Sequence, residues 1–344
     1  MHPPVRIAVI GAGLIGRRHI EHVAACSEAV LAGIADPSPA ARELAARHHV
    51  PCFVDIHALI DGTKPDGIIV ATPNALHVEH ALAAIEARIP VLVEKPLADT
   101  LEGAEKLVAA AETASVPLAV GHHRRHNPMI QHARQIIGEG RLGRLVSVHS
   151  FFWLMKPDDY FDVAWRREGG AGPVLINLSH DIDLMRYLCG EVIAVQAMDS
   201  HAVRGNAAEE SCVVTLRFDN GALGTITLSD TAVAPWSWEH TTGENPVYPQ
   251  TDQTCYFLAG TEGSLTVPKL EVWRNPARKS WWEPFEVTRH VAPKADPLPL
   301  QIMQFVRVIR GEEAPLVPGR EGLAAMRVID AVKRAARTGE TVRL

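Results

Sequence analysis

A glycine-rich turn near the start of the chain restricts its fold more than any other feature. The apolar segment Val5–Ile10 leads directly into Gly-Ala-Gly-Leu-Ile-Gly at 11–16, and a helical pattern follows. In such a turn the first glycine permits the tight bend, the second lets the backbone approach a pyrophosphate, and the third lets helix pack on strand. The helix start also favours anions. The predicted cofactor contacts here are Gly11, Gly13, Leu14, Ile15 and Gly16.

An acidic residue stands where a dinucleotide site needs one. Asp36 ends the second apolar segment, 20 residues after Gly16. Its carboxylate can accept hydrogen bonds from both ribose hydroxyls and would repel a 2′-phosphate, so the sequence favours NAD over NADP. Asp36 can also cap the helix expected after Pro37, and the two roles are compatible.

The first third of the chain alternates strand and helix patterns. Short, continuously apolar runs are typical of strands buried on both faces of a parallel sheet, and they occur at 5–10, 30–35, 67–71, 91–93 and 118–120. An apolar stripe at three- and four-residue spacing predicts a helix from Leu101 to Ala111, with Asp99 as its N-cap. We therefore expect an α/β chain whose residues 1–122 form a Rossmann-type, doubly wound parallel sheet.

After residue 122 the pattern changes. A helix is expected over 128–139, strands over 145–153, 212–218 and 222–228, and a final helix over 319–337. Asn220-Gly221 between two of these strands indicates a type I′ hairpin, and 231–253 is interpreted as a long surface loop. Residues 123–344 are thus predicted to form a substrate and oligomerisation domain of α+β type with a large open, mostly antiparallel sheet, and the C-terminal helix can pack back on the first domain.

Composition excludes several classes of protein. With 34 Lys and Arg against 40 Asp and Glu, the net charge is −6 and no basic footprint for nucleic acid is visible. Apolar runs are far shorter than a membrane span of roughly 18 residues, and the strand at 5–10 leaves no room for a signal peptide before it. Five scattered cysteines fit reduced thiols in the cytoplasm, and no zinc-type spacing occurs, so no metal site is expected.

Two further strands end in polar residues. Thr72, Pro73 and Asn74 follow the strand at 67–71, and Glu94-Lys95-Pro96 follows the strand at 91–93. Ligands of open α/β sheets bind beyond the carboxyl ends of the strands. These residues are therefore expected at the cofactor edge, although a lysine in a surface loop is the plainer interpretation of Lys95.

The chain resembles the Gfo/Idh/MocA family of glucose-fructose oxidoreductase and inositol dehydrogenase relatives. The matching stretches occur in the order typical of the family and are spread over most of the chain. They are residues 8–13, 71–74 with His77, 94–96, 120–121 with 124–125 and 127–128, and 165–166 followed by His180 and Asp183. This ordered set is far more specific than any one motif.

The resemblance implies a Rossmann domain, an open sheet domain and a substrate held between that sheet and the nicotinamide. It also implies that Lys95 is catalytic, often with a cis Lys95–Pro96 peptide bond, and that His180 is catalytic. The residues that it places beside the cofactor are Thr72, Pro73, Asn74, His77 and Glu94, with Lys95 next to them. The stretch containing Trp165 and Arg166 falls, by the same match, on the substrate side.

The stretch 177–185 has helical periodicity and would carry the substrate residues. Asn177 and Asp183 each lie about 60° from His180 around such a helix, with apolar residues roughly opposite. A single histidine in a helix is more often a structural residue of the core or the surface with its hydrogen bonds satisfied. The flanking polar residues and the family resemblance favour a catalytic role for His180. Members of the family commonly carry an aspartate four residues before this histidine, whereas this chain has Ile176, so Asn177 or Asp183 is expected to compensate.

Basic and aromatic residues offer other substrate contacts. His122, His123, Arg124, Arg125 and His126 crowd the domain crossover, and Arg124 could bind a carboxylate-bearing ring. A purely structural role at the junction is the favoured alternative. Four tryptophans, at 236, 238, 281 and 282, could line a ring-binding pocket or a subunit contact.

These observations favour an NAD-dependent dehydrogenase that oxidises a secondary hydroxyl of a cyclic polyol, sugar or related ring alcohol, some of them carboxylated. Lys95 would be the general base and His180 would orient the hydroxyl or relay the proton. Two alternatives share the fold: an NAD-dependent, redox-neutral glycosidase and a non-catalytic NAD-binding regulator. An open sheet face calls for a partner, so a homodimer or homotetramer is expected.

Overall fold

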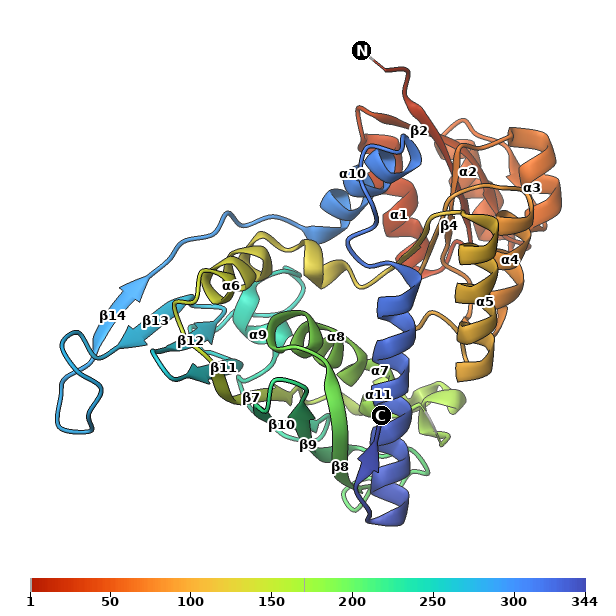
Figure 1. Ribbon diagram of the computed structural model, residues 1–344. Coiled ribbons are helices and arrows are strands. Elements are labelled where there is room, and N and C mark those ends of the chain that lie inside the picture. Colours follow the sequence, from red (N-terminus) through yellow and green to blue (C-terminus); the bar gives the residue numbers. More distant parts are fainter. Residues whose placement is uncertain (1, 170) are drawn as a thin grey trace. The chain divides into compact units, whose positions relative to one another are not determined.

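The computed structural model describes residues 2–169 and 171–344, which divide into two compact units (Figure 1). The first contains the chain up to His126 together with Asp296–Met326, and the second contains Asn127–Ala295 and Arg327–Leu344. Compared with the predicted ranges 1–122 and 123–344, the segment 296–326 returns to the first unit. The final helix is divided between the two units.

The first unit is a six-stranded parallel sheet in the order β3-β2-β1-β4-β5-β6. Its strands are β1 (Val5–Ile10), β2 (Ala29–Ala35), β3 (Cys52–Phe53), β4 (Gly67–Val70), β5 (Val91–Val93) and β6 (Leu118–Val120). Its helices are α1 (Leu14–Ala25), α2 (Pro39–Arg47), α3 (Ile56–Thr63), α4 (His77–Glu86), α5 (Leu101–Ala114) and α10 (Pro297–Ile309). The doubly wound, Rossmann-type sheet predicted from the apolar runs is confirmed, and the two-residue strand β3 is an addition that is too short for a sequence pattern.

Strand β1 lies at the centre of this sheet because it is apolar on both faces. Ile7, Val9 and Ile10 are almost completely buried, and two apolar clusters cover opposite faces of the sheet. Helix α10 supplies Ile302, Phe305 and Val306 to one of them, so a segment from late in the chain completes the core of the first unit. The predicted N-cap of α5 was wrong: Thr100, not Asp99, accepts the hydrogen bond from the backbone N–H of Gly103.

The second unit contains a nine-stranded sheet in the order β14-β13-β12-β11-β7-β10-β9-β8-β15. The strands are β7 (Leu145–Trp153), β8 (Val192–Ser200), β9 (Ser211–Phe218), β10 (Leu223–Ser229), β11 (Tyr256–Gly260), β12 (Ser264–Val267), β13 (Glu271–Arg274), β14 (Glu286–Arg289) and β15 (Val342–Arg343). Neighbours are antiparallel except β7 and β10, which are parallel. The predicted mostly antiparallel sheet is thus confirmed, with one parallel pair that the sequence did not reveal.

Helices accompany this sheet. They are α6 (Pro128–Gly138), α7 (Pro173–Ile176), α8 (Leu178–Cys189), α9 (Trp238–Thr242) and the second half of α11 (Gly319–Thr338), with the 3₁₀ turns η3 (Asp158–Asp162) and η4 (Ala164–Arg167) between elements. The 3₁₀ turn η2 (His123–His126) belongs to the first unit. Inward residues of β7, β9, β10 and β11 alternate with exposed ones, which is the pattern of a sheet buried on one face only.

Two local predictions for the second unit were wrong in detail. Asn220 does not have a positive φ, and only Gly221 does, at 88°. Hydrogen bonds from the N–H of Gly221 to the carbonyl of Phe218 and from the N–H of Phe218 to the carbonyl of Ala222 describe a three-residue loop with a glycine bulge rather than a type I′ turn. The loop predicted over 231–253 contains helix α9, which is too short to show periodicity.

Candidate active site

The carboxyl ends of the parallel strands in the first unit gather the predicted cofactor residues at one edge. Gly11 follows β1, Asp36 follows β2, Thr72 comes two residues after β4, and Glu94 follows β5. Because all six strands are parallel, these residues share the edge of the sheet at which ligands of doubly wound folds bind.

The three glycines of the turn meet different surroundings. Gly11 has a φ of 92°, and a Cβ there would lie 2.4 Å from the carbonyl oxygen of Ala71. A Cβ on Gly16 would lie 2.0 Å from the carbonyl oxygen of Gly11, whereas a Cβ on Gly13 would have nothing within 4 Å. The first and third glycines are therefore required by the protein itself. The second leaves open space at the start of α1, where Gly13 is the N-cap and no side chain caps the helix, and this arrangement fits a bound pyrophosphate.

Asp36 contacts the glycine-rich turn and Ser38. The predicted capping role was wrong, because Ser38 is the N-cap of α2 and its hydroxyl accepts the hydrogen bond from the N–H of Ala41. Oδ2 of Asp36 accepts a hydrogen bond from the N–H of Ala12 at 2.8 Å, and its Oδ1 accepts one from the N–H of Ser38, also at 2.8 Å. Burial acts to raise the pKa of this carboxyl, but the hydrogen bonds from Ser38 and Ala12 outweigh burial and lower it. Asp36 therefore stays ionised and half-exposed beside the turn, in a form that can accept hydrogen bonds from ribose hydroxyls.

His77 joins the ends of β4 and β5. The buried imidazole lies between two carbonyl oxygens, with Nδ1 2.8 Å from that of Pro96 and Nε2 2.8 Å from that of Thr72. Pro73 and Asn74 are exposed at the same edge. The ring of His77 thus fixes the main chain of two strand ends relative to one another. The Lys95–Pro96 peptide bond is cis.

A buried charged pair stands immediately before Lys95. Nε2 of His19, on α1, lies 2.7 Å from Oε1 of Glu94, and both side chains are almost fully buried. Glu94 also accepts a hydrogen bond from the N–H of Lys95. A Cβ on Gly121, after β6, would lie 2.8 Å from the same carboxylate, so the glycine provides room for it.

Burial acts to raise the pKa of Glu94, but the hydrogen bond and charge of His19 outweigh it, and the pKa is lowered. Glu94 is accordingly a buried carboxylate that adjoins the half-buried Lys95 and contacts the cofactor helix. No sequence pattern indicated the role of His19, although it lies one helical turn after Gly16.

The basic crossover segment is built into the first unit. Arg124 and Arg125 lie in η2 and are buried, and Nη2 of Arg125 donates to Oε2 of Glu321 at 2.8 Å. This ion pair gives Arg125 the structural role that was the alternative interpretation of the segment. Arg124 as a carboxylate ligand stays a prediction.

The predicted substrate helix begins differently from the sequence pattern. Asn177 lies between α7 and α8 rather than inside one helix, and its carbonyl accepts a hydrogen bond from the N–H of His180 at 3.1 Å. His180, Asp181 and Asp183 are all buried, and Tyr256 donates a hydrogen bond to Asp181. The predicted polar residues His180 and Asp183 are therefore both buried.

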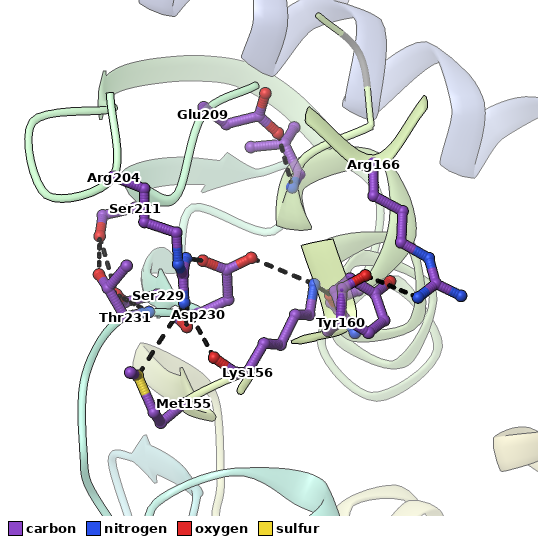
Figure 2. A network of polar contacts seen from close by, with 12 residues as sticks. Met155, Lys156, Tyr160, Arg166, Arg204, Glu209, Ser211, Ser229, Asp230 and Thr231 are labelled. Carbon is purple, nitrogen blue, oxygen red and sulfur yellow. Dashed lines mark hydrogen bonds and ion pairs between the residues drawn. The ribbon is translucent and has the colours of Figure 1, made fainter. Parts of the chain in front are cut away.

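A cluster that sequence reasoning missed adjoins this helix start (Figure 2). Nζ of Lys156, just beyond β7, lies 3.1 Å from Oδ1 of Asn177 and 3.2 Å from Oδ2 of Asp230. Nη1 of Arg204 lies 2.6 Å from Oδ1 of Asp230. One signal could have found it: Lys156, like Lys95, stands between an apolar strand and a proline.

The predicted aromatic and basic substrate residues lie in different surroundings. Arg166 stacks on the ring of Tyr160, with its guanidinium carbon 4.1 Å from the ring centroid, and Trp165 is half-exposed beside it in sequence. Of the four tryptophans considered for a pocket, Trp238 is a core residue stacked near Tyr256, whereas Trp281 and Trp282 are more than three-quarters exposed. Trp238 therefore does not line an open pocket.

The glycine turn, the ionised Asp36 and Lys95 at one sheet edge are the attributes of a nucleotide-dependent dehydrogenase. Two models of the Gfo/Idh/MocA oxidoreductase family match this chain. The model of the NAD-binding Rossmann fold matches residues 5–122, and the model of the C-terminal alpha/beta domain matches residues 134–344. The chain belongs to this family. It is an NAD-dependent oxidoreductase that acts on hydroxyl groups.

Individual relatives agree with this assignment. The chain is 29% identical over 300 residues to 1,5-anhydro-D-fructose reductase of Ensifer adhaerens, covering 84% of this chain and 83% of that protein. It is 25% identical over 353 residues to myo-inositol 2-dehydrogenase of Thermotoga maritima, covering 99% and 98%. The structure of the WlbA dehydrogenase of Bordetella pertussis with NADH and UDP-GlcNAcA superposes with a TM-score of 0.79 at 27% identity over 99% of both chains.

Within the described residues, no helix is both long and apolar enough to cross a membrane.

Proposed function

We propose that the protein oxidises a secondary hydroxyl of a cyclic polyol, a sugar or a related ring alcohol, with NAD as the hydride acceptor. Relatives named for an inositol, an anhydrosugar and a carboxylated cyclohexadiene diol support the ring-alcohol class. The observation that carries the proposal is Lys95, half-buried at the carboxyl edge of the parallel sheet, next in sequence to the buried carboxylate of Glu94.

NAD would be held by the edge of the first unit. The turn at 11–16 would receive the pyrophosphate, Asp36 the ribose hydroxyls, and Thr72, Pro73, Asn74 and Glu94 would border the nicotinamide half. His77 would act through the main-chain carbonyls that it holds. The geometry of Gly13 and Asp36 supports this assignment, and bound NAD supplies the acceptor for a hydride.

The protein must then remove the proton. Lys95 would act as the general base, and the positive charge of oxidised nicotinamide would favour its neutral form. The buried carboxylate of Glu94 has the opposite effect on Lys95, because an anion stabilises the protonated ammonium form. Lys95 is in that form after it has taken the proton from the substrate. His180 would orient the hydroxyl or relay the proton, and Asn177, Asp183, Arg124, Trp165 and Arg166 would bind the rest of the ring.

Two other functions fit the same fold. A redox-neutral glycosidase would cleave a glycosidic bond with no net NADH, and a non-catalytic regulator would bind NAD but not depend on Lys95 or His180. A lysine with its own buried carboxylate is an unnecessary feature in a regulator, and it favours catalysis.

We also propose that the enzyme works in the cytoplasm as a homodimer or homotetramer. The five cysteines are all free thiols in the structure, as suits a reducing compartment. The sheet of the second unit keeps large apolar side chains exposed on β7, β9, β10 and β11, including Val146, Val213, Leu223 and Phe257, and a second copy could cover them.

The test is NAD⁺ reduction against inositols, monosaccharides, anhydrosugars and quinate-like acids, with wild-type protein and the Lys95→Met variant. We expect the variant to bind NAD normally, because the pyrophosphate turn is unchanged, and to lose roughly 10²- to 10⁴-fold in kcat. Turnover within tenfold of wild type would exclude Lys95 as the base. Bond cleavage without NADH would favour the glycosidase.

A further inference from the structure

The one parallel pair in the second sheet brings a lysine and an aspartate together. The ladder between β7 and β10 continues beyond both strands: the N–H of Leu154 donates to the carbonyl of Ser229 at 3.0 Å, and the N–H of Lys156 donates to that of Asp230 at 2.9 Å. Parallel strands end at the same edge of a sheet. Lys156 and Asp230 are therefore neighbours because of the register, although 74 positions separate them.

The hydrogen-bonding capacity of Asp230 is divided between two cations. Its Oδ1 lies 2.6 Å from Nη1 of Arg204, its Oδ2 lies 3.2 Å from Nζ of Lys156, and its side chain is only 3% exposed. Arg204 is also fixed by the carbonyls of Asp230 and Lys156, at 2.8 and 3.0 Å. Figure 2 shows Asp230 between Arg204 and Lys156. One carboxylate thus serves two buried positive charges.

Lys156 keeps unused capacity at the same place. The ammonium group of Lys156 has three N–H donors. Among the described residues its oxygen partners are Oδ2 of Asp230 and Oδ1 of Asn177. On a further side the ammonium faces the ring of Tyr160, with Nζ 5.1 Å from the centroid. Burial lowers the pKa of Lys156 despite the opposing effects of the carboxylates of Asp230 and Glu239, so these neighbours do not fully compensate for removing the charge from water.

The surroundings place this charge at the substrate helix. Asn177, which accepts from Lys156, also accepts from the N–H of His180 through its carbonyl. The guanidinium of Arg166 also stacks on Tyr160 and lies on the other side of that ring in Figure 2. Its hydrogen bond goes to the carbonyl of Tyr160 at 2.7 Å rather than to Asp230 or Asn177. A neutral donor would be enough to join the end of β7 to Asn177 by a hydrogen bond. A lysine that is only 8% exposed also places a charge out of water, which costs free energy of folding.

We propose that Lys156 binds a carboxylate carried by the ring substrate, so that the preferred substrates are hydroxy acids rather than uncharged polyols. This inference rests on the proposed dehydrogenase function. The position four residues before His180 holds Ile176, whose side chain has no polar atom, while Lys156 offers a charged donor from the segment after β7. Lys156 would then recognise an acidic group on the substrate through a charge-assisted hydrogen bond.

The test measures binding and turnover separately. Isothermal titration calorimetry of NADH-loaded protein gives dissociation constants for D-glucuronate, D-galacturonate and quinate, each compared with its uncharged methyl ester. We expect wild-type protein to bind at least one acid about tenfold or more tightly than its ester, and Lys156→Met to reduce that preference to about twofold or less. Lys156→Arg keeps the charge and should retain most of the preference.

Lys269→Met is the matched control, because Lys269 is a partly exposed lysine of the same unit that pairs with Asp252. It should leave every preference unchanged. A wild-type protein that binds no acid better than its ester overturns the proposal, and so does a preference that survives in Lys156→Met. If Lys156→Met does not fold, loss of the preference in Lys156→Gln decides the question. Failure of the dehydrogenase function would appear separately, as acid binding without NAD⁺ reduction.

Discussion

The buried pair of His19 and Glu94 allows a quantitative prediction. In His19→Leu, the carboxylate of Glu94 loses the imidazole nitrogen that lies 2.7 Å away, in surroundings where the two side chains are 0% and 6% exposed. Glu94 has little freedom to move, because Gly121 packs against it so closely that a Cβ would lie 2.8 Å from the carboxylate. Breaking a buried pair by removing one partner costs about 3–5 kcal/mol, and we expect the first unit to lose this much stability.

For a unit of this size, each kcal/mol lowers the midpoint of thermal unfolding by roughly 2–4 °C, so the expected fall is roughly 6–20 °C. The assay is calorimetry or far-ultraviolet circular dichroism, because all seven tryptophans lie in the second unit and fluorescence would report on that unit instead. The double variant His19→Leu/Glu94→Leu removes both polar side chains, leaves no carboxylate buried without its partner, and should be more stable than His19→Leu. His22→Leu is the control, since His22 is on the same helix but 24% exposed and 3.5 Å from Asp296.

The pH dependence has a definite sign. The pKa of Glu94 is lowered in the folded protein, so its contribution to stability is present above the ordinary value of 4.5 and is lost as the pH falls through the lowered value. In His19→Leu the carboxyl of Glu94 loses its strongest compensating partner and keeps the weaker effects of His123 and Lys95, so it is protonated more easily. The difference between the two proteins should be largest near pH 7 and shrink under acidic conditions. A His19→Leu midpoint within about 2 °C of wild type at pH 7 would refute the reasoning.

Three more predictions concern the proposed site. Gly13→Ala should leave the midpoint of thermal unfolding unchanged, because the added Cβ meets nothing within 4 Å. It should weaken NAD binding about tenfold or more, because the Cβ occupies the space through which the pyrophosphate approaches the backbone. An unchanged NAD affinity in a titration would show that Gly13 is not part of the site. Asp36→Ser should narrow the preference for NAD over NADP. Equal shifts in both KM values would leave Asp36 only its observed hydrogen bonds to the N–H groups of Ala12 and Ser38. His180→Asn should lower kcat and kcat/KM together, as for an interaction made mainly in the transition state, and an active variant would show that His180 is structural.

Most of the parallel sheet of the first unit could be predicted from the sequence, whereas the return of residues 296–326 to its core could not. The turn at 11–16 is contiguous, its glycines have local steric causes, and the apolar runs around it are continuous because parallel strands are buried on both faces. Asp36 and Lys95 could be placed at one edge from strand order alone. Errors in this region were local: the cap of α5 moved by one residue because Thr100 offers the same kind of oxygen as Asp99.

Tertiary structure decided the remaining contacts, because they join positions that no periodicity connects. His19 meets Glu94 across 75 positions through the packing of α1 on the sheet. Lys156 meets Asp230 only because β7 and β10 are parallel neighbours, and a hydrophobic pattern states which face a residue occupies but not which strand lies beside it. Trp238 could equally have lined a pocket, and its burial against Tyr256 became visible only when α9 and β11 were placed together in the fold.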